Sequence, residues 1–388
     1  MYSRILDMRR LAEQKSFFLF GPRSTGKTSL LRAQFPADAI VNLLSSAVYL
    51  PLAANPSRFA DLVREMLFRH SVIVVDGIQK LPVLLDEIHN LIETVPVRFV
   101  LTGSCARKLK RSGVNLLAGR AWQANLFPLV SAEIADFDLG RYLRYGGLPQ
   151  VYSSPHPEEE LDAYLNTYLK EEIQAEALVQ NLAHFARFLK TAVLANAEQI
   201  NFANIANDAG LPASSIRAYF SILADTFTGF LVESWQASAK RKAVATAKFY
   251  LFDTGVAHFL RGDPPLTEGS AEHGKAFEQF IAMELRAWLS YRRRRLELRY
   301  WRTRSGNEVD FLIGETAAVE VKAARAISDK HMKGLRALKE EGVFRQFLIV
   351  SFDELERRTS DGIRCLHWKR FLAELWNDAL IETASSGD

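Results

Sequence analysis

The segment Gly21-Pro-Arg-Ser-Thr-Gly-Lys-Thr28 constrains the fold of this chain more than any other feature. Two glycines at this spacing, Gly21 and Gly26, let backbone amides turn toward phosphate oxygens. Lys27 would neutralise the phosphates, and the Thr28 hydroxyl would bind Mg²⁺. An apolar run precedes the segment and a helical pattern follows it, so the positive end of a helix would face the same charge. The sequence therefore predicts a P-loop that binds ATP together with Mg²⁺.

Short apolar runs alternate with helical patterns over the first 130 residues, which is typical of a parallel α/β sheet. The expected strands are Ser16–Phe20, Ile40–Leu44, Val72–Val75, Phe99–Thr102 and Asn125–Leu129. The third run ends at Asp76, where an acidic side chain would complete the Mg²⁺ site. Thr102 and Ser104 end the next run. Either hydroxyl could orient the attacking water, and an ordinary strand-end turn explains both equally well.

The chain has 388 residues and a net charge of +4, with 48% hydrophobic residues. This length and composition predict an ordinary globular protein of two or three domains. We find no apolar run long enough to cross a bilayer and no signal peptide core, and the two cysteines are far apart. The sequence therefore predicts a cytoplasmic protein with no membrane partner.

Helical patterns dominate from about residue 131 to 235, including Glu158–Val179 and Phe185–Ala197. Two short helices at Phe202–Ala209 and Ser214–Thr226 then precede two strand-like runs, Phe230–Trp235 and Lys248–Phe252. This order is typical of a winged helix. Its nucleic-acid contacts would come from the second helix and from the basic wing, that is from Ser215, Arg217, Lys240, Arg241 and Lys242. The surrounding segment is acidic overall, so contacts to a protein partner explain the pattern equally well.

A second group of charged residues lies near the carboxyl terminus. Asp310 and Glu320 fall in two alternating segments joined by a short turn, so an antiparallel hairpin would bring their carboxylates together to chelate Mg²⁺. Lys322 would project from the same face as Glu320 and stabilise a phosphorane or activate water. Glu278, on the preceding helix, could add a ligand. The alternative is a half-buried hairpin with an ordinary surface ion pair.

This arrangement of an Asp followed by Glu-x-Lys resembles the PD-(D/E)XK nuclease superfamily, whose core is a mixed sheet flanked by helices. The resemblance implies catalytic roles for Glu278, Asp310, Glu320 and Lys322. Trp301 and Arg302 lie beside the group in sequence and suit a nucleic acid, the ring by stacking on a base and the cation by contacting phosphate.

Several longer segments together resemble a family of prokaryotic AAA+ ATPases whose carboxy-terminal module has no assigned function. They are "GPRSTGKTSLL", "VVDGIQKLP", "VLTGSCARKL", "LLAGRAWQANLFPLVSAEI", "YLRYGGLPQVY", "KFYLFDTGVA", "GKAFEQFIAMEL" and "WRTRSGNEVDFLI". By this resemblance Arg120 would touch the γ-phosphate as an arginine finger, and an ordinary loop arginine fits it equally well. Arg23, inside the P-loop, would either contact phosphate or pair with a nearby acid.

One position departs from the family. The family carries Glu after the aspartate of the second acidic motif, where it polarises the hydrolytic water, and this chain has Gly77 there. A glycine cannot act as a base. We therefore expect firm nucleotide binding and slow hydrolysis, with Gln79 as a substitute that could position water.

The expected fold is α/β: an AAA+-type P-loop core at residues 1–130, a helical lid with a winged helix at 131–262, and a restriction-endonuclease-like domain at 263–388. The expected ligands are ATP and Mg²⁺, with DNA and further copies of the chain as candidate partners. One hypothesis is that nucleotide state controls DNA engagement and Mg²⁺-dependent cleavage. The alternative is a nucleotide-gated binding or scaffold protein with an inactive nuclease-like domain.

Overall fold

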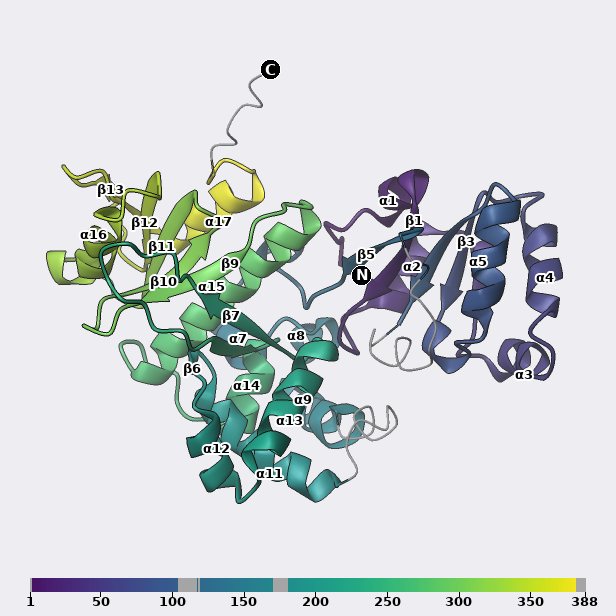
Figure 1. The fold of residues 1–388 in the computed structure, drawn as a ribbon, viewed down its shortest axis with the longest axis horizontal. Helices are drawn as coiled ribbons and strands as arrows, with labels where there is room; N and C mark the ends of the chain where they lie inside the picture. Colours follow the sequence, from purple (N-terminus) through teal and green to yellow (C-terminus); the bar gives the residue numbers. More distant parts are fainter. Residues whose placement is uncertain (1, 104–116, 118, 170–180, 382–388) are drawn as a thin grey trace. The chain divides into compact units, whose positions relative to one another are not determined.

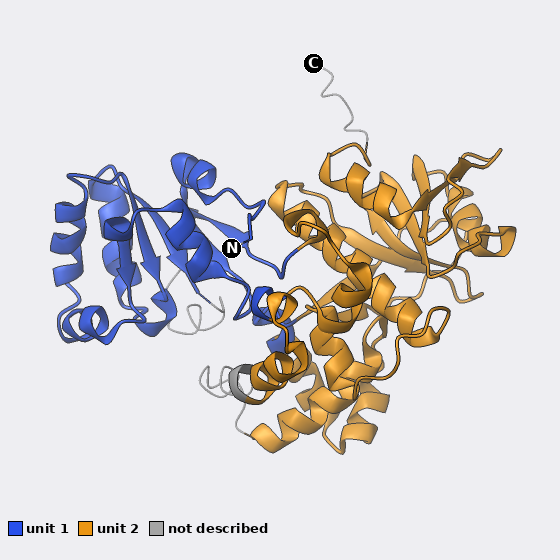
Figure 2. Cartoon of the chain, turned by 180° about the vertical axis from the view of Figure 1, so that it is seen from behind, with its two compact units in different colours: residues 1–129, 148–150, 222–228 blue, residues 130–147, 151–221, 229–388 orange. Residues whose placement is uncertain are grey.

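A computed structural model describes residues 2–103, 117, 119–169 and 181–381 (Figure 1). The chain divides into two compact units (Figure 2). Unit 1 contains residues 1–129, 148–150 and 222–228, and unit 2 contains residues 130–147, 151–221 and 229–388. Within the described residues, no helix combines the length and the apolar character that crossing a membrane requires.

Unit 1 is built on a five-stranded parallel sheet in the order β2-β3-β4-β1-β5. The strands are β1 Ser16–Phe20, β2 Ile40–Asn42, β3 Val72–Asp76, β4 Arg98–Thr102 and β5 Ala121–Asn125. The helices are α1 Met8–Gln14, α2 Lys27–Gln34, α3 Ser46–Ala54, α4 Arg58–Met66 and α5 Leu84–Thr94, with short 3₁₀ turns η1 Ala37–Ala39 and η2 Ile78–Lys80. The predicted parallel α/β core is confirmed.

The central strands carry apolar side chains on both faces because helices cover both sides of the sheet. All five residues of β1 are buried. On one face the core includes Phe18 and Phe20 of β1 together with Phe59 of α4 and Leu84 of α5. This packing fixes the carboxyl end of β1, which leads directly into Gly21.

The predicted fifth strand was placed too late in the chain. We expected Asn125–Leu129, and β5 instead runs from Ala121 to Asn125, paired with β1 in the register Ser16 to Ala121. A strand at the edge of a sheet need not be apolar on both faces. Only Ala124 of β5 is buried, so the apolar run after it misled the sequence analysis.

Unit 2 contains a nine-stranded mixed sheet in the order β13-β14-β12-β11-β10-β9-β7-β8-β6. The strands are β6 Glu198–Gln199, β7 Gly229–Ser234, β8 Lys248–Leu251, β9 Leu298–Arg302, β10 Glu308–Ile313, β11 Ala317–Lys322, β12 Gln346–Ser351, β13 Arg357–Arg358 and β14 Arg364–His367. β10 and β11 form the predicted antiparallel hairpin. β7 and β8, expected as the wing, pair with each other, and β7 also pairs with β9, so they belong to the same sheet as that hairpin.

The described helices of unit 2 lie before, between and after these strands in the sequence. They are α7 Leu139–Tyr145, α8 Pro149–Ser153, α9 Pro157–Ala163, α11 Leu182–Ala192, α12 Phe202–Ala209, α13 Ala213–Asp225, α14 Thr254–Leu260, α15 Ala271–Tyr291, α16 Lys333–Lys339 and α17 Trp368–Trp376. The terminal residues of α8 and α13 belong to unit 1 by their packing. Short turns are η3 Ser131–Glu133, η5 Val193–Ala195 and η6 Asp329–Met332. The helix expected at Glu158–Val179 begins as α9 and widens into a π-helical turn, η4 Tyr164–Leu169, while residues 170–180 lie outside the described part.

Two of the segments that carry the family resemblance, YLRYGGLPQVY and KFYLFDTGVA, are joined by hydrogen bonds in unit 2. Asp253 is fully buried at the start of α14 and accepts hydrogen bonds from the backbone amides of Gly147 (2.8 Å) and Val256 (3.0 Å). The Thr254 hydroxyl donates to the carbonyl of Tyr142 (2.7 Å). The carboxylate therefore caps one helix and holds the end of another, which is a packing role.

Candidate functional site

The P-loop lies between β1 and α2, as the sequence predicts. The Lys27 ammonium donates to the carbonyls of Gly21 and Pro22, each at 2.7 Å, so the side chain folds back across its own loop. The backbone approach here is close: a Cβ at Gly21, where φ is +151°, would lie 2.2 Å from the carbonyl oxygen of Leu126. Only glycine fits that position.

Arg4 braces the same loop and was missed by the sequence analysis. Its guanidinium donates to the carbonyls of Thr25 and Phe127, both at 2.7 Å. These bonds join the amino-terminal segment, the P-loop and the segment after β5. No spacing rule singles out such an arginine, because its partners are backbone carbonyls distant in sequence.

Two of the predicted nucleotide-site residues, Thr28 and Thr102, converge on the carboxylate of a third, Asp76. Asp76, at the end of β3, is 4% exposed. Its Oδ2 accepts a hydrogen bond from the Thr28 hydroxyl at 2.9 Å, and its Oδ1 accepts a short one from the Thr102 hydroxyl. β3 is next to β4 in the sheet, which brings Asp76 and Thr102 together at the carboxyl ends of parallel strands.

These residues fit a magnesium–nucleotide complex. Thr28 and Asp76 are an adjacent hydroxyl and carboxylate, the hard oxygen donors that Mg²⁺ takes from P-loop proteins. A cavity of about 230 Å³ opens beside them, lined by Thr28, Leu31, Arg32, Phe35, Ala37, Ile40, Asn42 and Asp76. α2 begins at Lys27, so its first amides would serve as phosphate donors. When bound, Mg²⁺ would neutralise the charge that develops on the phosphate oxygens.

Gly77 follows Asp76 in a left-handed conformation with φ of +85°. Its amide donates to the Thr102 hydroxyl at 3.0 Å. A Cβ at this position would lie 2.9 Å from Cδ2 of Leu44, beyond the end of β2 and on the opposite side of β3 from β4 and β1. The backbone at the family's glutamate position is therefore shaped for glycine.

Gln79 is the residue that the sequence offered as a substitute for positioning water. Its Oε1 is buried and has no hydrogen-bond partner among the described residues. It lies near Gly103, since a Cβ on that glycine would be 3.4 Å from it. An unpaired buried carbonyl oxygen costs free energy unless a ligand or water satisfies it.

The other predicted residues of this site differ in what they contact. The Arg120 guanidinium is hydrogen-bonded to the Glu93 carboxylate, which holds the pKa of Glu93 below its usual value. Arg23 lies half-buried within the loop. Ser104 lies outside the described residues.

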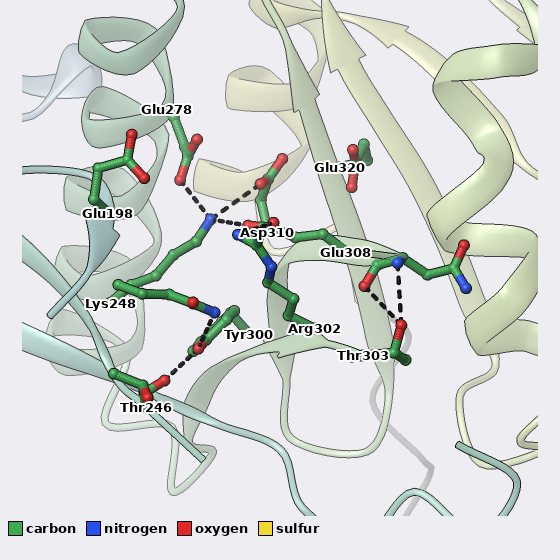
Figure 3. Close-up of polar contacts among 12 residues, drawn as sticks. Glu198, Thr246, Lys248, Glu278, Tyr300, Arg302, Thr303, Glu308, Asp310 and Glu320 are labelled. Atoms are coloured by element: carbon green, nitrogen blue, oxygen red, sulfur yellow. Dashed lines mark hydrogen bonds and ion pairs between the residues drawn. The ribbon is translucent and has the colours of Figure 1, made fainter. Parts of the chain in front are cut away.

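The acid–lysine group of unit 2 also comes together, around a residue that the sequence analysis did not select. The Lys248 ammonium, on β8, lies 3.0 Å from Glu278, 2.6 Å from Glu308 and 3.3 Å from Asp310 (Figure 3). On the other strand of the hairpin, Lys322 lies 2.6 Å from Glu320 and 3.8 Å from Asp310. We call Lys248, Glu278, Glu308, Asp310, Glu320 and Lys322 the acid–lysine cluster.

Burial and mutual charge shift the protonation of this cluster. Burial raises the pKa of Glu278 to about 7, against the lowering effect of Lys248. Burial and the nearby Asp310 hold the pKa of Glu320 well above its usual value. Burial alone would raise the pKa of Asp310, but Lys322 and Lys248 hold that pKa below normal. The pKa of Lys248 is raised despite burial, because Glu278 and the neighbouring acids favour the ammonium.

The cluster does not fit a divalent metal as it stands. Mg²⁺ requires oxygen ligands at about 2.1 Å. Here Asp310 and Glu320 are each engaged by an ammonium, and in the described part of the chain no three Asp, Glu, His or Cys side chains are grouped to hold a metal ion. The predicted Mg²⁺ ligands of unit 2, Asp310 and Glu320, therefore lie close together, but the ammonium of Lys322 lies within 3.8 Å of both.

The predicted nucleic-acid residues are only partly accessible. Trp301 is fully buried in the core between the sheet and α16, so its predicted stacking on a base is wrong. Arg241 donates to Glu340 (2.6 Å) and to the carbonyl of Ala337 (2.9 Å), and Arg302 pairs with Glu308 at 3.1 Å. The remaining predicted contacts are Ser215, which is half-buried, and Arg217, Lys240 and Lys242, which are exposed.

Three consecutive parts of the chain match known family models. Residues 13–135 match the family model of an AAA domain. Unit 1 therefore contains an AAA domain. Residues 136–267 match a domain of unknown function, DUF8612, and residues 273–371 match another, DUF4143. The AAA domain thus contains the P-loop, Asp76 and Thr102, while Lys248 and the carboxylates around it fall in two different matched regions.

Two curated proteins are similar to most of the chain. They are the uncharacterized protein Mb2031c of Mycobacterium bovis and the uncharacterized protein Rv2008c of Mycobacterium tuberculosis. Each is 24% identical over 336 residues, which is 81% of this chain and 71% of the relative. The similarity therefore extends well beyond the AAA domain.

Proposed function

We propose that the chain is an ATP-binding switch that hydrolyses its nucleotide slowly. The observation that carries this proposal is the pair of hydrogen bonds from Thr28 and Thr102 to Asp76, followed directly by Gly77 in a left-handed backbone. The first feature provides the oxygen donors for Mg²⁺. The second removes the side chain that would polarise water, which typically contributes a factor of about 10² to 10⁴ to the rate.

The chain connectivity gives the switch a route to unit 2. Residues 222–228 are the end of α13 and the turn that leads to β7, and they belong to unit 1. Within that segment Phe227 packs on Phe20 with ring centroids 6.0 Å apart, and Phe20 directly precedes Gly21. A change of loop conformation on nucleotide binding would act on this contact and, through the chain, on the strand that begins at Gly229.

The test is to measure ATP binding and phosphate release on the same preparation. We expect saturable, Mg²⁺-dependent ATP binding that Lys27→Ala abolishes. We expect phosphate release below about 0.1 s⁻¹, that is at least ~100-fold under a typical enzyme turnover of about 10 s⁻¹. A wild-type turnover of several per second would overturn the slow-switch proposal, and absence of binding would overturn the nucleotide site.

Gly77 variants provide the control for the missing base. A glutamate at residue 77 would point toward Leu44, so Gly77→Glu should not accelerate phosphate release. Gly77→Ala carries the same backbone strain without a carboxylate, and both variants should lose a similar amount of stability, of order 1 kcal/mol or more. A large rate increase in Gly77→Glu alone would show that residue 77 is the catalytic position and that only its side chain is lacking.

DNA engagement is a second candidate function, supported by how the segment after β7 is held. Glu341 accepts hydrogen bonds from the Ser238 hydroxyl (2.9 Å) and from the amides of Ala239 (2.8 Å) and Lys240 (2.9 Å). The loop is thereby anchored with Lys240 and Lys242 exposed. Exposed lysines on an anchored loop suit phosphate contacts that are independent of base sequence.

We expect a labelled DNA duplex to bind weakly and with a marked dependence on salt. Replacing both Lys240 and Lys242 by Ala should reduce the slope of log affinity against log salt by about 2, since each phosphate contact contributes about 0.9. Lys190→Ala combined with Lys369→Ala removes the same charge from two other exposed positions. Equal slopes for the two double variants would argue against a specific role of this loop.

A further inference from the structure

Lys248 is surrounded on its charged end by acids from two elements. Glu278 projects from α15, while Glu308 and Asp310 come from β10. The lysine side chain is 4% exposed, and its nitrogen lies within 3.3 Å of all three carboxylates. An ammonium has three N–H donors and no acceptor; here it donates hydrogen bonds to Glu278 and Asp310, and Glu308 adds an ion pair.

The surroundings fix the ammonium in place. The Tyr300 ring lies with its centroid 5.4 Å from the lysine nitrogen, and the Tyr250 hydroxyl donates to the same Glu278 oxygen at 2.7 Å. Both tyrosine side chains are fully buried. A cation over an aromatic face and among desolvated carboxylates is held more firmly than a surface ion pair.

The negative charge of the cluster is largely compensated without a metal. Its four carboxylates, on Glu278, Glu308, Asp310 and Glu320, are met by Lys248, by Lys322 and by Arg302, which lies 3.1 Å from Glu308. A divalent cation placed among these groups would add two positive charges next to the three that the lysines and Arg302 already carry, and they would repel it. The carboxylates are also spaced for nitrogen, with N···O separations of 2.6–3.3 Å, and not for a metal at about 2.1 Å.

We propose that Lys248 is the resident cation of the acid–lysine cluster: its ammonium takes the place of a divalent metal, and removing that charge converts Glu278, Glu308 and Asp310 into a divalent-cation site. The wild-type cluster is then a metal-independent structural lock between β8, α15 and β10. The same arrangement blocks Mg²⁺-dependent phosphodiester cleavage there, which favours the binding or scaffold role for unit 2. The proposal rests on these ion pairs and is independent of the nucleotide switch.

The test is a Mn²⁺ titration of nucleotide-free protein, followed by the electron paramagnetic resonance of free Mn²⁺ and by thermal unfolding. The wild-type protein should have no Mn²⁺ site that the substitution Asp310→Asn removes. Lys248→Met removes the charge and keeps most of the side-chain length. It should bind one Mn²⁺ per chain and unfold at a higher temperature with Mn²⁺ than without it, because a ligand that binds only the folded state stabilises it.

Two variants separate this proposal from a general effect. Lys248→Arg keeps a cation in the cluster and should behave as wild type, and Lys248→Met combined with Asp310→Asn should lose the Mn²⁺ site. A folded Lys248→Met or Lys248→Gln chain that binds no Mn²⁺ would overturn the proposal. The wild-type arm tests it without any Lys248 variant: a stoichiometric Mn²⁺ site that Asp310→Asn removes would also overturn it.

Discussion

Asp76→Ala is expected to lower the affinity for ATP in the presence of Mg²⁺ by about 100-fold, because it removes the carboxylate that would bind the metal beside Thr28, and an interaction with a charged group contributes about 1.5–3 kcal/mol. The substitution also leaves the Thr28 and Thr102 hydroxyls without their acceptor. Because Asp76 acts through the metal, affinity measured without Mg²⁺ should change far less. Calorimetric titration with ATP, with and without Mg²⁺, measures both quantities.

The matched control is Asp86→Ala, which removes an exposed carboxylate from the first turn of α5 in the same unit. It should leave both affinities unchanged. Equal losses with and without Mg²⁺ in Asp76→Ala would mean that the substitution disturbs the P-loop itself. That outcome would remove Asp76 from the metal site and leave only its role in positioning Thr28.

The sequence predicted the nucleotide site well because its determinants are local. Gly21 to Thr28 fix one turn between one strand and one helix, and parallel strands bring Asp76 and Thr102 to the same edge of the sheet. What failed was β5, where partial exposure of an edge strand removes the apolar signal. Arg4 was invisible to pattern analysis because it binds backbone carbonyls, which any residue type supplies.

The acid–lysine cluster was predictable only in part. Period-two alternation in Glu308–Ile313 and Ala317–Lys322 predicts the hairpin, and the hairpin brings Asp310 and Glu320 to the same lysine. Lys248 lies outside this local pattern. Its strand resembles half of a separate wing in the sequence, and the pairing of β7 with β9 joins that strand pair to the sheet that contains the hairpin. The position of Lys248 in the cluster therefore depends on a tertiary contact, the pairing of β7 with β9, which residue spacing in the sequence does not predict.

We expect unit 2 to lose stability as the pH rises from about 5 to 8, because of the buried carboxyl of Glu284. Glu284 of α15 is 1% exposed, and burial raises its pKa from 4.5 to about 7, although hydrogen bonds from Ser131 and Trp376 lower it. The Ser131 amide donates at 2.7 Å, the Ser131 hydroxyl at 3.0 Å and the Trp376 indole at 2.6 Å. These hydrogen bonds stabilise the ionised carboxylate, but by less than the loss of its hydration destabilises it.

The sign of the effect follows from proton binding. Between pH 4.5 and 7 the folded state holds the Glu284 proton that the unfolded state has released, so the free energy of unfolding falls as pH rises. The stabilisation is complete below the unfolded pKa and is lost through the folded pKa, which amounts to about 3 kcal/mol at 1.36 kcal/mol per pKa unit. Urea unfolding at pH 5, 6, 7 and 8 measures the slope.

Glu284→Gln should flatten this slope, whatever its effect on absolute stability, because the amide does not titrate. Glu272→Gln, in the first turn of the same helix and partly exposed, should keep the wild-type slope. The carboxyl of Glu278, whose pKa is also raised to about 7 by burial, should leave a residual slope in Glu284→Gln. If Glu284→Gln retains the full wild-type slope, the Glu284 carboxyl is already ionised at pH 5, and its hydrogen bonds outweigh the cost of burying the charge.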